Sequence, residues 1–443
     1  MQPIRSRTCA LLVVACSFIS LTPVGALAAN TDEAIQALIA FKEGCNRAEA
    51  LWPAQLCGPI VLVDPSTREA VANQPAPGGQ FKRQEGMFLG KWPTEMDVAN
   101  TAMAWGGTQW AVVMLPLSQD PFTRLQLLAH ESFHRIQPEL GFDMADTMAQ
   151  HLDEQEARTW LRLELRALAR SLRSEGDDAR EAALDALLFR HIRNASFPDS
   201  EPVERRLEGH EGLAEYTGMR FALDATGAGM EEIARRVEAF EKRTTYVRSL
   251  GYGTGPALGM LLDRYQPGWR RSIGTTPDLA RHLASALAAP EASSARRDVA
   301  DRRAAIYGYA TIREEETKRS EHLTAERKRY RQALIEGPVL HVELPERRLL
   351  YNPNTVLSLG DEGNVYPKST LIGPWGRLTL QDGGALAPGY RDRARVAAPK
   401  IIAPDAQGIV TGPGWTLTLE LGWRLVPATR SGDFRIERVE GTE

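Results

Sequence analysis

The feature that most constrains this chain is a His-Glu-x-x-His motif made by His130, Glu131 and His134. On an α-helix, residues four apart lie one above the other, so the two imidazoles are predicted to converge on one point beside the helix. Such convergence is typical of a metal site, and Glu131, about 100° further round the helix, can reach a water at that point. We therefore expect His130 and His134 to bind a metal ion and Glu131 to act as a general base.

Helix signals surround this motif. Asp120 is a candidate N-cap, and Pro121 suits the first position of a helix. Apolar and small side chains fall on the face away from the two histidines: Leu125, Leu128, Ala129, Ser132 and Ile136. The competing interpretation is an ordinary amphipathic helix on which two histidines coincide by chance.

Length and composition are typical of a globular protein with more than one domain. The chain has 443 residues, of which 43% are hydrophobic and 25% are charged, and its formal net charge is −4. No basic patch dominates the sequence, so neither nucleic acid nor an anionic membrane surface is expected as a partner.

The N-terminal segment is typical of an export signal. Two arginines precede the apolar run of residues 10–19, and residues 26–28 form a small-x-small cleavage site. We therefore expect residues 1–29 to be removed and the mature protein to be periplasmic or secreted. Cys16 ends a lipobox-like run, so a lipid anchor at Cys16 is the alternative. No later stretch is long and apolar enough to predict a transmembrane helix.

Two cysteines, Cys45 and Cys57, follow the predicted signal. In an exported chain, this close pair predicts one disulfide that closes a short loop around Trp52. The alternative is a pair of buried thiols. Zinc binding by the pair is not expected, because no further His or Cys residues cluster near it.

A second motif, Glu-Gly-Leu-Ala-Glu-Tyr at residues 211–216, supplies carboxylates. A zinc site with two histidines needs a third protein ligand, which leaves the fourth position for water, and Glu211 is our candidate. Glu215, one turn later on the same face, is expected to accept the remaining N–H of a ligating imidazole and so to fix its orientation. His210 is the rival third ligand, but it points about 100° away from Glu211 on a helix, so both are not expected to bind together.

The two motifs together resemble those of the gluzincin metallopeptidases, in particular the peptidase-MA-like group. In that group one helix carries two histidine ligands and the general base, and a second helix of the form Glu-Gly-x-Ala-x-Tyr carries the glutamate ligand. The resemblance implies that one Zn²⁺ is bound by His130, His134 and Glu211. Glu131 would then activate water, and Glu215 would orient a ligand. The spacing departs from the family: Glu211 follows His134 by 77 positions, where many gluzincins have a couple of dozen.

A glycine-rich start to an apolar helix follows at residues 250–262. In gluzincins a Tyr-x-x-Gly at the beginning of a helix often lies over the zinc, and residues 252–255 are similar. By this resemblance Tyr252 donates a hydrogen bond to the oxyanion that develops on the attacked carbonyl. The alternatives are that Tyr252 is a packing residue and that Tyr246 is the donor. A phosphate-binding loop is not expected, because the Lys-Ser/Thr of the P-loop is missing.

Periodicity predicts an α+β fold. Helical spacing marks residues 31–50, 143–192 and 268–335, with a break between helices near residues 174–178. A short β-branched run at residues 60–65, stopped by Pro65, predicts one strand, and residues 110–116 predict another. If the second of these strands lies at a sheet edge, its unpaired backbone groups can bind an extended peptide.

The pattern changes after residue 336. From there to the C-terminus, short β segments alternate with turns, at residues 339–344, 348–351, 377–380, 415–421 and 434–439. The clean alternation in residues 415–421 predicts a half-buried antiparallel sheet in a small sandwich or barrel. We therefore expect a signal at 1–29, a mainly helical zincin-like domain with a small N-terminal sheet at 30–336, and a small β domain at 337–443.

These features predict an exported zinc metallohydrolase, most simply a peptidase that acts on peptide or protein substrates. Zinc would lower the pKa of a bound water to about 7, and Glu131 would pass the proton of that water to the leaving amine. Two alternatives stay open. One is an exported binding or scaffold protein with a structural zinc site, and the other is a zinc amidase that acts on non-peptide amides.

Overall fold

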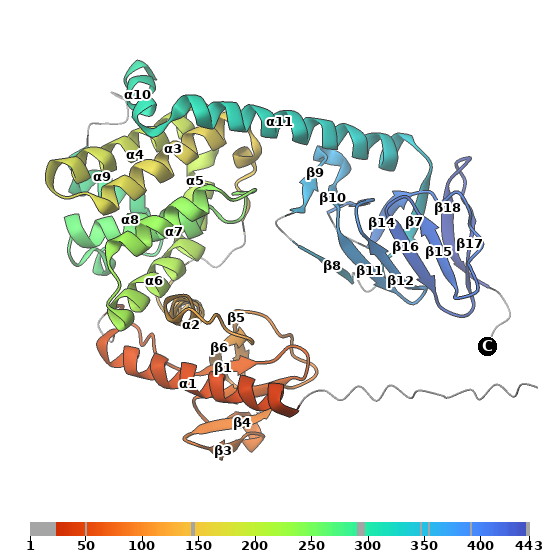
Figure 1. Ribbon diagram of the computed structural model, residues 1–443, viewed down its shortest axis with the longest axis horizontal. Helices are drawn as coiled ribbons and strands as arrows, with labels where there is room; N and C mark the ends of the chain where they lie inside the picture. The colour runs from red at the N-terminus through yellow and green to blue at the C-terminus, as the bar shows by residue number, and fades with distance from the viewer. Residues whose placement is uncertain are drawn as a thin grey trace, which may run out of the picture. The chain divides into compact units, whose positions relative to one another are not determined.

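The computed structural model describes residues 24–48, 51–142, 147–289, 297–345, 348–352, 355–389 and 392–439 (Figure 1). Cys16 and most of the predicted signal lie outside these residues, and helix α1 (Val24–Ala48) begins within residues 24–29. The fold is α+β, as predicted, with β strands in the C-terminal region after a mainly helical part. In the described part of the chain, no helix has the length and apolar character needed to cross a membrane.

Contacts between residues divide the chain into two compact units. The described residues of Met1–Ala145, Leu213–Gly229 and Gly268–Pro277 make up the first, and the second comprises those of Asp146–Gly212, Met230–Pro267 and Asp278–Glu443. The division falls within one uninterrupted helical segment, because α5 (Ser200–Leu207), the π-helical turn η3 (Glu208–Gly212) and α6 (Leu213–Thr226) follow one another directly.

The first unit contains a six-stranded sheet in the order β3-β4-β2-β1-β6-β5. Its strands are β1 (Ile60–Val63), β2 (Glu69–Ala72), β3 (Lys82–Gln84), β4 (Met87–Lys91), β5 (Thr101–Trp105) and β6 (Thr108–Met114). The strands β1 and β6 are parallel, and the other neighbours are antiparallel. All four side chains of β1 are buried, as expected for a β-branched run in the interior of a sheet.

The β-branched runs at residues 60–65 and 110–116 are therefore present as β1 and β6. The condition for strand addition at β6 is not met, because β6 lies between β1 and β5, and β5 is the edge strand on this side of the sheet. The tight turn that brings β5 against β6 is Gly106-Gly107, and both glycines have positive φ. Two such residues are what a type I′ hairpin turn requires, and this dipeptide is the sequence signal for β5.

Helix α2 (Pro121–Ile136) carries the His-Glu-x-x-His motif and packs against α6 and β6. Its first turn is capped by Asp120, whose carboxylate accepts the backbone N–H of Thr123 at 3.0 Å. Close packing on α6 depends on Gly218, because a Cβ there would lie 2.5 Å from the carbonyl oxygen of Gln126. Helices α2 and α6 therefore approach each other with backbone in contact.

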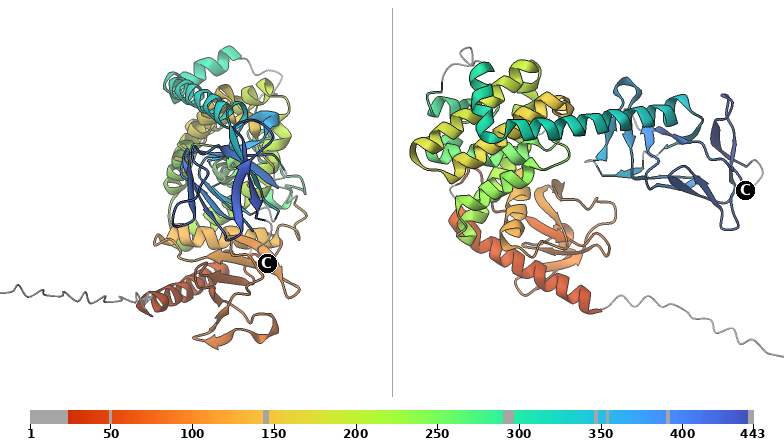
Figure 2. Two further views of the ribbon diagram at one scale, coloured as in Figure 1. Left: turned by 90° about the vertical axis from the view of Figure 1, so that its right-hand side faces the viewer. Right: turned by 45° about the horizontal axis from the view of Figure 1, so that its top comes forward.

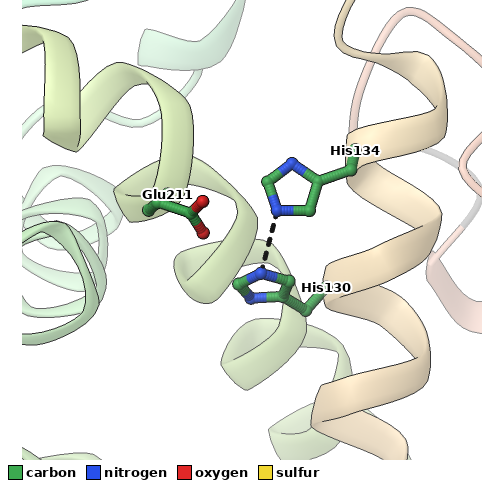
Figure 3. A group of neighbouring side chains, drawn as sticks. All are labelled: His130, His134 and Glu211. Carbon is green, nitrogen blue, oxygen red and sulfur yellow. Dashed lines mark hydrogen bonds between the residues drawn. The ribbon is translucent and has the colours of Figure 1, made fainter. Parts of the chain in front are cut away.

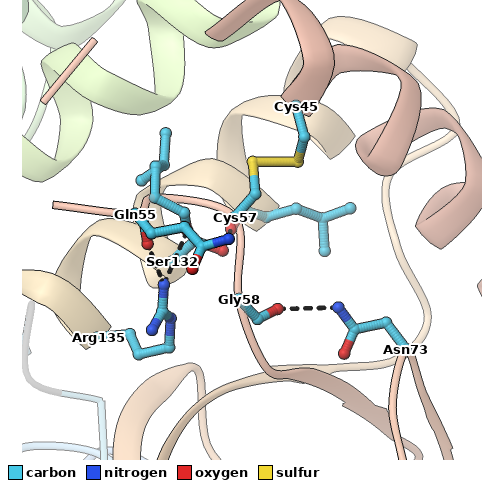
Figure 4. Close-up of a disulfide and its surroundings, with 9 residues drawn as sticks. Cys45, Gln55, Cys57, Gly58, Asn73, Ser132 and Arg135 are labelled. Atoms are coloured by element: carbon cyan, nitrogen blue, oxygen red, sulfur yellow. Dashed lines mark hydrogen bonds between the residues drawn. A yellow bond between two sulfur atoms is a disulfide. The ribbon is translucent and has the colours of Figure 1, made fainter. Parts of the chain in front are cut away.

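Cys45 and Cys57 form a disulfide that closes a loop beside α2 (Figure 4). In this loop Trp52 is buried, and its ring centroid lies 5.0 Å from that of Phe133 on α2. The Nε1–H of Trp52 also donates to the hydroxyl of Thr217 on α6 at 2.9 Å. The loop therefore touches both of the helices that pack together.

Arginine side chains hold the backbone of the same loop. Arg135, the residue after His134, donates to the carbonyl oxygens of Gln55 and Leu56, the latter at 3.2 Å (Figure 4). Arg270 donates to the carbonyl oxygen of Leu51 at 2.9 Å. These bonds satisfy carbonyl groups of a segment that has no regular secondary structure.

The second unit is built around α3 (Gln155–Arg173), which packs against α4 (Gly176–Ser196), α7 (Met230–Glu241), α8 (Leu250–Tyr265) and α11 (Tyr309–Arg331). Shorter helices α9 (Leu279–Ala286) and α10 (Arg297–Ala304) complete the helical part. Helix α11 is fixed by buried charge, since Glu316 accepts from Arg158 at 2.6 Å and from Arg162 at 3.1 Å.

The C-terminal strands of this unit form a two-sheet sandwich, one of the two architectures predicted. One sheet has the order β17-β18-β7-β14-β13-β10-β9, and the other β15-β16-β12-β11-β8. Side chains of both sheets share one core, which includes Leu340, Val396, Leu378 and Leu417. The strands are β7 (Val339–Glu343), β8 (Leu349–Tyr351), β9 (Leu357–Ser358), β10 (Asn364–Tyr366), β11 (Ser369–Gly373), β12 (Gly376–Leu380), β13 (Ala385–Ala387), β14 (Arg393–Ala397), β15 (Ile409–Gly412), β16 (Trp415–Leu419), β17 (Trp423–Pro427) and β18 (Phe434–Arg438).

The end of α11 leads into this sandwich (Figure 2). Tyr330 and Leu334 are buried there in a second cluster with Leu357, Val365 and Leu386 of the larger sheet. Tyr330 belongs to the last turn of α11, and Leu334 lies in the π-helical turn η7 (Gln332–Glu336) that follows it.

We expect loss of the disulfide to destabilise the protein without removing the fold. The double variant C45S and C57S should lower the free energy of unfolding by about 2–4 kcal/mol, because a crosslink over 12 residues restricts the unfolded chain. Urea unfolding followed by tryptophan fluorescence measures this difference. Wild-type protein unfolded in the presence of a reductant is the control and should match the variant, whereas equal stability of all three samples would contradict the prediction.

Candidate metal centre

His130 and His134 lie one turn apart on α2, and both side chains are buried (Figure 3). Their Nε2 atoms are 3.0 Å apart. Glu211 of η3 points toward the same place (Figure 3). Each of the three residues offers one ligand atom, and these atoms all lie within 4.8 Å of one another. This group can hold a metal ion.

The hydrogen bonds of the other ring nitrogens determine what the two imidazoles offer. The Nδ1 atom of His130 is 2.9 Å from a carboxylate oxygen of Glu215, and the Nδ1 atom of His134 is 2.6 Å from the amide oxygen of Gln137. Both oxygens only accept, so each Nδ1 carries a hydrogen and each Nε2 is left to bind a cation. The two Nε2 atoms lie 3.0 Å apart and face the same point. The donor set therefore fits a metal ion.

Glu215 joins α6 to α2 at two points. Besides the bond to His130, its second oxygen accepts a hydrogen bond from the amide of Gln126 at 2.6 Å. Gln126 lies one turn before His130 on the same face of α2. The carboxylate is thus held in place before it orients the imidazole, which is the arrangement expected of a partner to a metal ligand.

Sequence reasoning missed Gln126 and Gln137. Each lies three or four residues from a histidine of the motif, so helical spacing was the available signal. Gln137 is fully buried at the end of α2, where its backbone N–H donates to the carbonyl of Phe133. An amide that is buried beside an imidazole is expected to be part of its hydrogen-bonding environment.

The predicted general base, Glu131, is also buried on α2, with 5% of its surface exposed. It follows His130 directly, so it lies about 100° round the helix from that ligand. The rival third ligand, His210, lies with its Nδ1 atom 3.8 Å from a carboxylate oxygen of Glu211. Among the described residues, the group that can hold a metal contains Glu211 and not His210.

The two tyrosines considered as oxyanion donors have different environments. Tyr252 lies half-buried in the first turn of α8, and the guanidinium of Arg243 is 6.0 Å from its ring centroid. Its role stays a prediction. Tyr246 is fully buried, its hydroxyl donates to the carbonyl oxygen of Glu241, and burial raises its pKa to about 12. Because the hydroxyl of Tyr246 is buried and already donates to a carbonyl oxygen, we do not consider it further as the donor to the oxyanion.

Comparison with known proteins adds no family assignment. None of the protein-family models, curated proteins and solved structures compared with the chain matches it. The resemblance to gluzincins therefore depends on the two short motifs and the Tyr-x-x-Gly at residues 252–255.

Glu215 is expected to control metal affinity through His130. The variant E215Q should bind zinc about tenfold to a hundredfold more weakly, because the imidazole loses its charged acceptor. Competition with a chromophoric chelator measures the dissociation constant. The control is D224N, which removes a carboxylate from the exposed face of the same helix, where Asp224 pairs with Arg220. Equal zinc affinity in E215Q and D224N would show that Glu215 does not orient a ligand.

Proposed function

We propose that this chain is a zinc-dependent hydrolase that cleaves peptide bonds. The observation that carries the proposal is the grouping of His130, His134 and Glu211, whose ligand atoms all lie within 4.8 Å of one another. Two imidazoles and one carboxylate are a usual donor set for catalytic zinc, whereas magnesium and calcium prefer oxygen ligands. A zinc ion held there supplies a Lewis acid, which acidifies water and polarises a carbonyl group.

The residues of the chain then divide the remaining work. The carboxylate of Glu131 accepts a proton from the attacking water and delivers it to the nitrogen of the leaving amine. Glu215 and Gln137 accept the Nδ1 hydrogens, so that each imidazole presents Nε2 to the metal position and keeps its orientation. The hydroxyl of Tyr252 donates to the oxyanion as the carbonyl is attacked.

A strand edge supports peptides over other amides as substrates. In the six-stranded sheet β5 is an edge strand, and it contacts α2, the helix with both histidines. An extended peptide can add to such an edge through backbone hydrogen bonds. We therefore assign peptide binding by strand addition to β5, and not to the adjacent β6 that was considered from the sequence.

The alternative of a structural zinc site is weaker. Structural zinc usually has four protein ligands, and the group found among the described residues has three. A structural zinc site also has no need of a general base such as the buried Glu131, because no water molecule reacts there. Activity against non-peptide amides would use the same residues, so substrate profiling separates the two hydrolase assignments.

We also propose that the protein works outside the cytoplasm. The Cys45–Cys57 disulfide supports this assignment, because structural disulfides persist in oxidising compartments. The signal-like sequence of residues 1–29 supports it independently.

The variant E131Q tests the proposed function. It should keep one zinc per chain and lose about a hundredfold to ten-thousandfold in the rate of peptide cleavage, because the amide cannot accept the proton of water. Elemental analysis and a mixed peptide library, applied to the same samples, measure both quantities.

The matched control is the variant S132A, which changes the residue next to Glu131 on the same helical turn. Ser132 is buried, and its hydroxyl donates to the carbonyl oxygen of Leu128 at 2.7 Å, so this variant should cleave as the wild type does. If the wild type and E131Q both bind zinc and neither cleaves peptides, the result would instead support the binding-protein or non-peptide alternative. A wild type that binds no zinc would contradict the metal site itself.

A further inference from the structure

Glu211 lies in a π-helical turn. Residues 208–212 form η3 between α5 and α6, so the helical segment widens for one turn where it presents this carboxylate. Such a turn is less favourable than regular α-helix, is rare, and often occurs at functional sites. Surrounding contacts must therefore stabilise it.

One such contact is made by Glu208, the first residue of the turn, which is 2% exposed. Its carboxylate accepts two hydrogen bonds from Arg190 of α4, at 2.9 and 2.5 Å. It accepts a third from the hydroxyl of Thr254 on α8, at 2.6 Å. The beginning of the turn is thus bonded to two neighbouring helices.

Arg190 is itself fixed by a longer chain of buried ion pairs. Glu164 of α3 accepts from Arg190 through one oxygen at 2.8 and 2.6 Å, and from Arg193 through the other at 2.6 Å. Arg193 continues to Glu204 of α5 with two bonds, and Glu204 accepts from His151 at 2.7 Å. Buried charges with several hydrogen bonds each have little freedom to move, because a displaced charge would be left without a partner.

The glycines of α8 hold the turn by direct backbone packing. A Cβ atom on Gly255 would lie 2.3 Å from the Cα atom of Gly212, and one on Gly251 would lie 2.5 Å from the carbonyl oxygen of Leu207. Only glycine permits so close an approach. The glycine-rich sequence at residues 250–262 therefore has a packing role that its pattern alone did not reveal.

From these contacts we propose that Arg190, Glu208 and Thr254 are positioning residues for the metal site. They hold the π-helical turn in the form that directs Glu211 toward His130 and His134, and so they raise the affinity for zinc without touching it. This inference rests on the proposed function only in that Glu211 is taken as a ligand.

The test compares T254V with T159V. Both variants replace the hydroxyl of a buried helical threonine by a methyl group, but Thr159 bonds only to the carbonyl of Gln155 on its own helix. We expect T254V to bind zinc about threefold to tenfold more weakly in competition with a chelator, and T159V to bind as the wild type does. Thermal unfolding of the metal-free proteins establishes that both variants fold.

A double-mutant cycle with E211A shows whether Thr254 acts through Glu211. If it does, T254V weakens zinc binding in the wild-type background and has no further effect when Glu211 is absent. Equal loss in both backgrounds would overturn the inference, as would unchanged affinity in T254V. E208Q provides a second variant of the same turn and should also weaken zinc binding. Failure of the wild type to bind zinc would instead contradict the proposed function, so the two failures are distinguishable.

Discussion

Two hydrogen bonds to imidazole Nδ1 atoms determine the chemistry that this structure can support. In these bonds the Nδ1–H groups of His130 and His134 donate to Glu215 on α6 and to Gln137 at the end of α2, and both Nε2 atoms then face one point. The bond to Glu215 requires α6 to lie against α2, and that packing in turn requires Gly218. The disulfide loop strengthens the same pair of helices through Trp52. Local chemistry at the histidines thus depends on how two helices pack.

Two buried glutamates of the second unit, Glu204 and Glu208, are stabilised as anions to different degrees. Burial alone raises the pKa of Glu204, but Arg193 and His151 lower it overall to about 2, so this carboxylate is well stabilised as an anion. Burial raises the pKa of Glu208 above its usual value in spite of Arg190 and Thr254. Glu208 is therefore the less stabilised end of the ionic chain. Loss of a single hydrogen bond has the greatest consequence at such an end, which is where the chain meets the π-helical turn.

Features encoded by local spacing could be predicted from the sequence, and features that depend on distant partners could not. Helical and alternating periodicity predicted the α+β fold, and spacing within a single helix brought together His130 and His134. The edge strand β5 was missed because its residues 101–105 are short and weakly β-branched, although Gly106-Gly107 marked the turn. Arg190 and Glu208 looked like ordinary helical charges, and only the fold shows that they pair in the interior.

The buried pairing of Arg190 with Glu208 gives a structural reason for the long separation between the two motifs. The 76 residues between His134 and Glu211 contain α3, α4 and α5, and these helices supply Glu164, Arg190, Arg193 and Glu204 of the ionic chain. A shorter connection would remove the partners of Glu208 and with them the support for the π-helical turn. The helices between the two motifs therefore stabilise the irregular turn from outside, and so allow a less regular helix at the candidate ligand.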